Sequence, residues 1–362
     1  MPLRTFCAIC KNEDFEIINE FPNFPIMTLC TNDEINLFYN YCLILCKKCS
    51  CLQLRNLIDP SILYSTGYTM ATFSPSWLAH NIKFGDFILE NTESESFLEI
   101  GANKGGLYKI LSNKRKLDYT ILDMYKDSDL PSDVKFMEGN CETFDFTGIH
   151  AVILSHVFEH LYSPSKFIEQ LSKSNVKEIF ISNPNFDLCL DKQFFNTVWS
   201  EHTFYCGFDH MMYIFSMYKY RCYSFFQYDG AVTSQMYKFV YDPSMKPKAL
   251  PYIDKQLFKN IYVDKVKLIQ DLEITEKSVI CPSGIYGQKL YYFLKNKENI
   301  IGFIDNNPQR QAKKLYGTGQ IVYSPKDIDY TKVNVLLCNS TYNDEIIAGL
   351  KELCHTVKIT IV

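Results

Sequence analysis

Two pairs of cysteines near the start of the chain have the spacing of metal ligands. Cys7 and Cys10 form one CxxC pair, and Cys46 and Cys49 form a second pair after 35 intervening residues. A CxxC turn can place two thiolates on one ion, and four thiolates at about 2.3 Å are a preferred ligand set of Zn²⁺. Because four cysteines leave no open coordination position, we predict a structural zinc site without a catalytic role. The alternative is a pair of reduced, metal-free turns.

A glycine-containing turn further along the chain has the composition of a nucleotide-binding loop. Glu99, Gly101, Asn103 and Gly105 stand between a short apolar run and a helical pattern. Glycines at such a place let the chain turn tightly and let its backbone approach a bound ligand. An ordinary tight connection between a strand and a helix would use the same residue types. The turn by itself is compatible with both interpretations.

Two polar residues at later strand ends favour the binding interpretation. Asp123 ends the next predicted strand, 24 residues after Glu99, where a carboxylate can accept hydrogen bonds from both hydroxyls of a ribose. Asn140 follows the third predicted strand, at a position that can meet an adenine edge. The spacing of Glu99, Gly101 and Gly105 departs from the dinucleotide GxGxxG pattern. It looks like the S-adenosylmethionine signature of class I methyltransferases.

The elements that must position these residues form two series of alternating strands and helices. The first series has strands at 97–100, 119–124, 134–137, 151–155 and 176–182 and helices at 75–92, 104–113 and 165–174, followed by a helix at 209–219 and strands at 221–228 and 234–241. The second has strands at 278–284, 299–305, 333–339 and 357–362 and helices at 286–296 and 343–353. This alternation predicts doubly wound α/β sheets. Residues 1–60 predict an irregular unit with short strands, and the prolines of 242–252 predict a linker.

The composition excludes several classes of protein. With 47% apolar residues, 22% charged residues and a net charge of −4, the chain is neither disordered nor typical of duplex nucleic-acid binders. No apolar run reaches the roughly 18 residues that span a bilayer, and the first residues lack the apolar core of a signal peptide. The 14 cysteines in 362 residues are too sparse for a disulfide scaffold. We therefore predict reduced thiols and a cytoplasmic location.

Motifs in three parts of the chain, in the same order, resemble the sugar C-methyltransferases of deoxysugar biosynthesis. They are CAIC…CKKCSCLQL and the Tyr/Ser-rich segment 64–74, then LEIGANKGGL, SHVFEHLYSP (155–164) and NTVWSEHTFYCGF (196–208), and finally GIYGQK (284–289) and the segment 302–325. The resemblance implies a zinc-binding domain at 1–65, a class I methyltransferase sheet at 66–245 and a second Rossmann-like α/β domain at 246–362.

The resemblance also implies a reaction, in which a methyl group passes from S-adenosylmethionine to a nucleotide-linked keto-sugar. A sugar carbon becomes a nucleophile only after a proton beside the ketone is removed, which requires a base and a stabilised oxyanion. The resemblance indicates His202 as the base. Glu201 could orient the imidazole or bind a hydroxyl, and Tyr68 could donate to the oxyanion. The alternative is that Glu201 and His202 are a polar pair in a loop without a catalytic role. The resemblance places His156 on the wall of the donor pocket. His156 and His160 also have a metal-binding HxxxH spacing, but the sequence shows no third ligand, so we predict that His160 is a packing or capping residue.

Other interpretations remain beside this one. Trp199 stands where the family usually has a tyrosine, so O- or N-methylation of a sugar or glycan is an alternative. A non-catalytic protein that binds zinc and a nucleotide is a second one. In the C-terminal series, Gly284, Gly287 and Asp305 resemble a nucleotide-binding βαβ unit, and a domain that only supports the interface is the alternative. The expected partner is a nucleotide-sugar substrate, with no nucleic acid or membrane, and the expected state is a monomer or homodimer.

Overall fold

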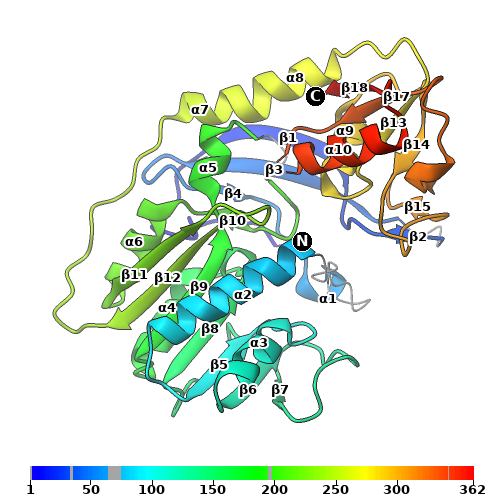
Figure 1. Cartoon of the computed structure of the whole chain (residues 1–362). Helices are drawn as coiled ribbons and strands as arrows, with labels where there is room; N and C mark the ends of the chain where they lie inside the picture. Colours follow the sequence, from blue (N-terminus) through cyan, green and yellow to red (C-terminus); the bar gives the residue numbers. More distant parts are fainter. Residues whose placement is uncertain (1, 33–35, 64–74, 195–197, 341) are drawn as a thin grey trace.

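Three sheets organise the chain in this computed structural model, which describes residues 2–32, 36–63, 75–194, 198–340 and 342–362 (Figure 1). An antiparallel sheet comes mostly from the N-terminal segment, a seven-stranded sheet forms the centre of the sequence, and a five-stranded parallel sheet comes from the C-terminal segment. None of the helices in these ranges is long and apolar enough to cross a membrane.

The central sheet has the order β11-β12-β9-β8-β5-β6-β7. Its strands are β5 (Ser96–Ile100), β6 (Asp118–Asp123), β7 (Lys135–Glu138), β8 (Ala151–Ser155), β9 (Glu178–Pro184), β11 (Tyr220–Tyr228) and β12 (Ser234–Tyr241). The first five are parallel to one another, whereas β12 runs antiparallel to both β9 and β11. Because β5 pairs with β6 on one side and with β8 on the other, the chain changes direction across the sheet there. In open α/β sheets such a switch point, at the carboxyl ends of the strands, is where ligands bind.

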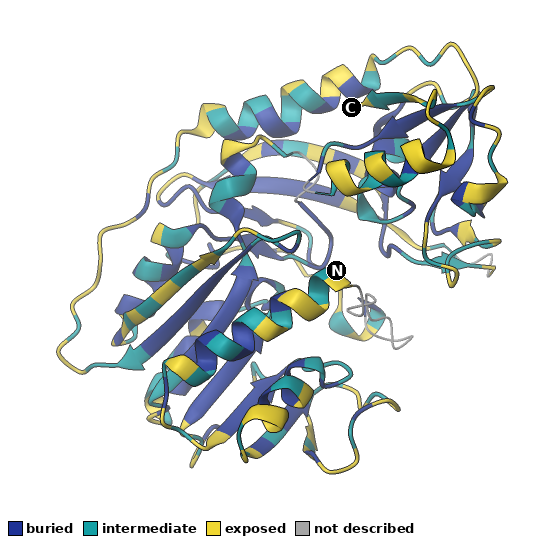
Figure 2. Ribbon diagram, viewed as in Figure 1, coloured by how far each residue is buried: buried dark blue, intermediate teal, exposed yellow. Residues whose placement is uncertain are grey.

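Helices cover both faces of this sheet, which confirms the doubly wound architecture. They are α2 (Pro75–Glu90) and α3 (Gly106–Lys114) on one face, and α4 (Pro164–Lys173) and α6 (Phe208–Met217) on the other. Strand β8 shows why: Val152 and Leu154 belong to the apolar cluster of α4 and α6, while Ile153 belongs to that of α2 and α3. A strand covered on both faces is apolar throughout. The inner strands β8 and β9 are buried in this way, whereas the edge strands β7 and β11 are largely exposed or half-buried (Figure 2).

The N-terminal sheet corrects one prediction. Its order is β1 (Phe15–Pro25), β3 (Phe38–Cys46), β4 (Leu52–Leu54) and β10 (Phe204–Tyr205), so the segment contains strands of 11 and 9 residues instead of an irregular, short-stranded unit. The register of β1 against β3 shifts twice, between Ile17 and Asn19 and between Phe21 and Phe24. Such bulges interrupt the alternation of apolar and polar residues by which a strand is recognised in a sequence.

The C-terminal sheet has the order β16-β14-β13-β17-β18, with all strands parallel. Its elements are β13 (Ser278–Cys281), α9 (Ile285–Phe293), β14 (Ile300–Ile304), β16 (Val322–Tyr323), β17 (Asn334–Leu337), α10 (Asn343–Leu353) and β18 (Lys358–Ile361), preceded by α7 (Lys255–Lys259), a π-helical turn (Asn260–Asp264) and α8 (Lys265–Gln270). Between β12 and α7 the chain forms neither helix nor strand, as a linker requires.

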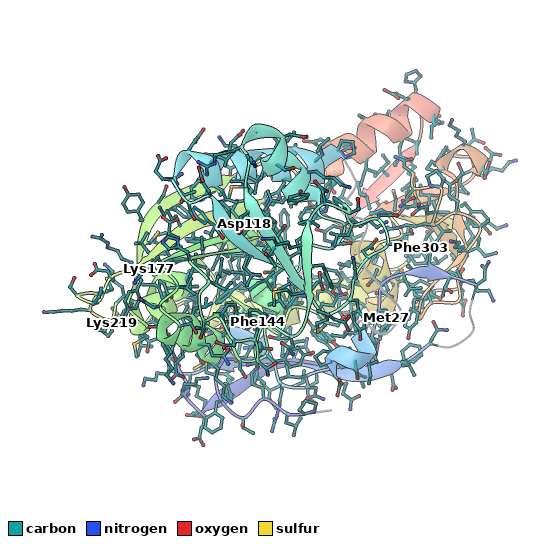
Figure 3. The ribbon with its side chains drawn as sticks, turned by 90° about the horizontal axis from the view of Figure 1, so that it is seen from below. Met27, Asp118, Phe144, Lys177, Lys219 and Phe303 are labelled. Atoms are coloured by element: carbon teal, nitrogen blue, oxygen red, sulfur yellow. The ribbon has the colours of Figure 1, made fainter. Side chains whose placement is uncertain are left out.

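The N-terminal sheet joins the other two units. Phe21 and Phe24 of β1 pack against α9, with ring centroids 4.9 Å from Phe293 and 4.8 Å from Tyr292, respectively. The short elements α1 (Pro60–Leu63), α5 (Phe186–Asp191) and the pair β2 (Cys30–Thr31) with β15 (Lys314–Leu315) complete the fold. Met27 and Phe303 share one apolar cluster and lie on the same side of Figure 3, away from Lys177 and Lys219.

Candidate functional site

One cavity of about 850 Å³ brings most of the predicted site residues together at the carboxyl ends of the central strands. Of the residues predicted from the sequence, those that line it are Glu99, Gly101, Asn103, Asp123, Asn140, His156, Glu201 and His202. Gly105 is not among the lining residues, and Tyr68 lies outside the described residues. Six of the seven residues predicted to bind S-adenosylmethionine therefore line the same cavity as the predicted Glu201–His202 pair.

The turn after β5 needs glycine for two separate reasons. Gly101 has a φ of +68°, and a Cβ there would lie 2.6 Å from Cγ2 of Val157. Gly105 has a φ of +69° at the start of α3, so its role is in the turn and not in the lining. Left-handed backbone of this kind favours glycine. Asn103, also left-handed with a φ of 51°, points its backbone N–H toward Asp123.

Asp123 is held at the end of β6 by backbone donors. Its Oδ1 accepts a hydrogen bond of 2.7 Å from the N–H of Met124, and its Oδ2 accepts one of 3.3 Å from the N–H of Asn103. A carboxylate has about four acceptor positions, so two bonds leave capacity for the hydroxyls of a ribose. Burial raises the pKa of Asp123, and the backbone bonds counter this by stabilising the charged form.

Two other residues predicted to bind the methyl donor form hydrogen bonds with residues close to them. Glu99 is buried and its Oε2 accepts a hydrogen bond of 3.0 Å from the Tyr119 hydroxyl, while burial raises its pKa to about 8. The Oδ1 of Asn140 accepts a bond of 2.8 Å from the N–H of Glu142. The oxygen of Asn140 is therefore engaged within its own turn, and its amide NH₂ is the group that would meet the acceptor nitrogens of an adenine.

Three histidines, His156, His160 and His202, line the cavity, and His80 packs directly behind His156. His156 follows β8 with a φ of 53°, and its Nε2 lies 2.9 Å from the Oγ of Ser234. The rings of Trp77 and His80 pack against it, with centroids 4.9 Å and 5.0 Å away. Burial lowers the pKa of both His80 and His156 to about 3, so these imidazoles are neutral at physiological pH. His156 lines the cavity, and its assignment to the wall of a donor pocket stays a prediction.

The loop before β10 is fixed by its own side chains. The Tyr205 hydroxyl accepts a bond of 2.6 Å from the N–H of Trp199 and donates one of 3.0 Å to the Trp199 carbonyl. The N–H of Thr203 donates to the carbonyl of Glu159 at 3.0 Å. These bonds hold Glu201 and His202, which lie between the two anchors, beside the turn that follows β8.

The structure places His202 next to groups that the sequence could not connect with it. Its ring centroid lies 4.9 Å from that of His160, and its Nε2 lies 3.9 Å from the Oε1 of Glu159. His160, which we predicted to be a packing or capping residue, does pack against His202, and it also lines the cavity. Glu159 was not predicted at all. The only sequence signal for it is its position inside the HVFEH stretch.

Burial dominates the ionisation of this group. It raises the pKa of Glu159 to about 7 and of Glu201 to about 8. It lowers the pKa of His202 well below the usual value, helped by the neighbouring His160 and by Lys289. Water exclusion therefore favours the neutral form of every group here.

Lys289 connects the C-terminal unit with the cavity. It lies on α9, is buried, and donates to the carbonyl of Val198, directly before Trp199 of the cavity wall. Burial lowers its pKa to about 7. A side chain from the third sheet thus supports the loop that carries Glu201 and His202.

The four predicted zinc ligands form one cluster. The Sγ atoms of Cys7 and Cys49 are 3.6 Å apart and those of Cys10 and Cys46 are 3.5 Å apart, and all four lie within 4.8 Å of one another. Thiolates bonded tetrahedrally to zinc at about 2.3 Å would be separated by roughly 3.8 Å. The donor set and its geometry therefore fit a closed zinc site.

Surrounding groups support this cysteine cluster. The N–H of Ile9 points at the Sγ of Cys7 at 3.4 Å, and His210 contacts the carbonyl of Cys49 at 2.8 Å. Donors to the sulfur stabilise thiolate charge, as outer contacts of metal ligands commonly do. His210 lies on α6, so the cluster is attached to the central unit.

The predicted nucleotide motif of the C-terminal sheet is satisfied internally. Asp305 Oδ2 accepts bonds from the Ser283 hydroxyl at 2.7 Å and from Arg310 Nη1 at 3.0 Å. A Cβ on Gly287 would lie 2.0 Å from the carbonyl oxygen of Pro282, so this glycine permits close packing of α9 on its strand. These contacts agree with the alternative in which the domain supports the interface.

Comparison with known proteins finds similarity in structure alone. No family model matches the chain, and no curated protein matches it. Solved structures that match include the N-methyltransferase NodS from Bradyrhizobium japonicum in complex with S-adenosyl-L-homocysteine (14% identity, 48% of this chain and 90% of that chain, TM-score 0.38). They also include PH0226 from Pyrococcus horikoshii (12%, 51% and 98%, TM-score 0.39) and the magnesium protoporphyrin IX methyltransferase ChlM from Synechocystis with bound S-adenosylhomocysteine (13%, 49% and 91%, TM-score 0.37).

The sheet itself determines the class of fold. The doubly wound α/β sheet predicted from the sequence is present, and its strand β12 runs antiparallel to its neighbours. With identities of 12–14% and TM-scores below 0.4, the solved structures say nothing of the reaction or the substrate of this chain.

Proposed function

We propose that the chain is an S-adenosylmethionine-dependent methyltransferase whose donor and acceptor meet in the 850 Å³ cavity. The main support for this proposal is that residues from separate parts of the sequence line one cavity. Residues that were assigned to the donor from three different strand ends, among them Gly101, Asp123 and Asn140, line the same cavity as Glu201 and His202.

The donor would bind along the turn after β5. Asp123 accepts the ribose hydroxyls, the amide of Asn140 meets the adenine, and the backbone at Gly101 lets the sulfonium part approach the sheet. Transfer of a methyl group from a sulfonium is an in-line displacement, so the enzyme contributes chiefly alignment and exclusion of water. Trp77 and His156 line this part of the cavity, and the buried ring of His80 packs against both of them, which would help to exclude water there.

For the acceptor, we favour a nucleotide-linked keto-sugar that is methylated at carbon. This choice rests on the resemblance of the sequence motifs and is supported by the position of Glu201 and His202 on the cavity wall. The Glu201–His202 pair would take the proton from the carbon beside the ketone, with His202 as the base and Tyr68 as a donor to the oxyanion. The cysteine cluster would hold structural Zn²⁺, and the C-terminal domain would support the acceptor loop through Lys289.

The test is an incubation of the protein with methyl-labelled S-adenosylmethionine and a panel of nucleotide-linked keto-sugars. We expect label in the sugar, with the new carbon–carbon bond visible by NMR, and a large loss of turnover in His202→Ala. A methyl group on oxygen or nitrogen would contradict the carbon assignment. Full turnover of His202→Ala would refute the base role, and failure to bind S-adenosylhomocysteine in calorimetry would refute the enzyme itself.

A further inference from the structure

A second group of potential metal ligands lies on the wall of the cavity, far from the cysteine cluster in sequence. Glu159, His160 and His202 can each offer one ligand atom, and these atoms lie within 4.8 Å of one another. Glu159 and His160 belong to the 3₁₀ turn Phe158–His160, which comes shortly after β8, while His202 comes from the loop before β10. The bond between the N–H of Thr203 and the carbonyl of Glu159 holds the two segments together.

The carboxylate of Glu159 has the environment of a group that lacks its counterion. The residue is only 5% exposed, and neither side-chain oxygen has a hydrogen-bond partner in the described part of the chain. The nearby imidazole nitrogens are Nδ1 of His156 at 3.5 Å and Nε2 of His202 at 3.9 Å from Oε1. A buried, unpaired carboxyl group is costly unless it is hydrogen-bonded or coordinates a metal.

Glu201 adds a second such group. It is 7% exposed, its Oε1 has no hydrogen-bond partner among the described residues, and its Oε2 lies 3.8 Å from Nδ1 of His160. Two buried carboxyl groups therefore face a set of imidazoles. The charge of Lys289 helps to lower the pKa of His202, and the Lys289 ammonium group donates a hydrogen bond to the Val198 carbonyl. A divalent cation bound by the Glu159 carboxylate and the neighbouring imidazoles would supply the partner that Glu159 lacks among the residues that the structure describes.

We propose that Glu159, His160 and His202 bind a divalent first-row transition-metal ion that holds an oxygen atom of the acceptor. Two imidazoles and one carboxylate are a ligand set for ions such as Zn²⁺, Mn²⁺ or Co²⁺, and unlike four cysteines they leave coordination positions open. Those positions face the cavity, because all three ligands line it. Ligands bonded at about 2.1 Å are separated by roughly 3.0–3.5 Å, so binding would draw the three side chains slightly together.

The inference rests on the proposed function and changes one part of it. An ion on the ketone oxygen acts as a Lewis acid that stabilises the enolate. The C–H bond beside the ketone would break, its electron pair would move into the enolate, and the proton would go to Glu201, because His202 would serve as a ligand. The ion would supply positive charge that stabilises the enolate oxygen. The enolate carbon then bonds to the methyl group as the methyl–sulfur bond breaks, which leaves neutral S-adenosylhomocysteine. No electrons enter or leave the pair of substrates.

The test is a titration of the full-length protein with Mn²⁺, followed by electron paramagnetic resonance. Manganese is chosen because carboxylate and imidazole suit it better than thiolates do, so the cysteine cluster does not compete. We expect one Mn²⁺ per chain, with nitrogen couplings from imidazole, and at least a tenfold loss of affinity in Glu159→Gln and in His160→Ala. The exposed His150 is the control, and His150→Ala should bind as the wild type does.

Three outcomes would overturn the proposal: no bound Mn²⁺ in the wild type, an ion without nitrogen couplings, or variants that bind as tightly as the wild type. Glu159→Gln keeps the size of the side chain, and the wild-type titration and its spectrum decide the question even if a variant does not fold. Binding of S-adenosylhomocysteine is measured on the same samples. If the protein binds Mn²⁺ but not S-adenosylhomocysteine, the proposed function is refuted and the metal site is supported. If it binds S-adenosylhomocysteine but not Mn²⁺, only the metal site is refuted.

Discussion

Replacement of Asp123 by asparagine is the sharpest test of the donor site. The carboxylate of Asp123 lines the cavity and already receives backbone bonds at Oδ1 from Met124 and at Oδ2 from Asn103. In Asp123→Asn one of these oxygens becomes an NH₂ group, which cannot accept from a ribose hydroxyl and faces a backbone donor. A hydrogen bond to a charged group contributes about 1.5–3 kcal/mol. We therefore expect the affinity for S-adenosylhomocysteine to fall by about 10- to 100-fold.

Isothermal titration calorimetry measures this loss, and the same strand supplies the control. Asp118 begins β6 at its other end, where its exposed carboxylate pairs with Lys135 at 2.5 Å. An exposed ion pair of this kind contributes about 0–1 kcal/mol to stability, so Asp118→Asn should bind the ligand as the wild type does. If folded Asp123→Asn binds within twofold of the wild type, Asp123 does not accept the ribose hydroxyls.

Three further predictions concern the turn, the cysteines and the buried lysine. Gly101→Ala should lower the free energy of unfolding by about 1–3 kcal/mol in chemical denaturation, because the backbone there is left-handed and the new Cβ would lie 2.6 Å from Val157. Val157→Ala in the same chain should restore part of the lost stability. If it restores none, the contact with Val157 is not the cause. Cys46→Ser should abolish stoichiometric zinc in elemental analysis and lower the melting temperature, whereas Cys222→Ser, outside the cluster, should retain the metal. Burial lowers the pKa of Lys289 to about 7, so above this pH the unfolded chain binds a proton at Lys289 that the folded chain does not. Between pH 7 and 9 the free energy of unfolding of the wild type should therefore rise by about 2 kcal/mol relative to that of Lys289→Met. A difference between the two proteins that does not change with pH would refute the burial effect.

The donor side of the cavity could be predicted from the sequence because its determinants are local. A glycine turn after a buried strand and a carboxylate at the next strand end have fixed meanings in a parallel sheet, whose carboxyl ends lie along one edge. Gly101 and Asp123 therefore needed only the order of the strands to be placed. The same periodicity located the predicted helices and strands of both α/β series to within a few residues, although it missed the two-residue strand β16.

The group around His202 could not be predicted, because its geometry depends on a loop. His160 and His202 are 42 positions apart. They are brought together by the hydrogen bond from the Thr203 N–H to the Glu159 carbonyl and by the bonds of the Tyr205 hydroxyl to the backbone of Trp199. Neither contact has a periodic signal. The length of β1 was missed for a related reason, since its two register shifts break the alternation that marks a strand.

A crystal structure of the protein with S-adenosylhomocysteine would show whether this cavity binds S-adenosylmethionine for methyl transfer. We expect the ligand in the cavity, with both ribose hydroxyls within hydrogen-bond distance of Asp123 and the sulfur directed toward the groups around His202. A ligand bound elsewhere, or a cavity that stays empty at saturating concentration, would contradict this expectation.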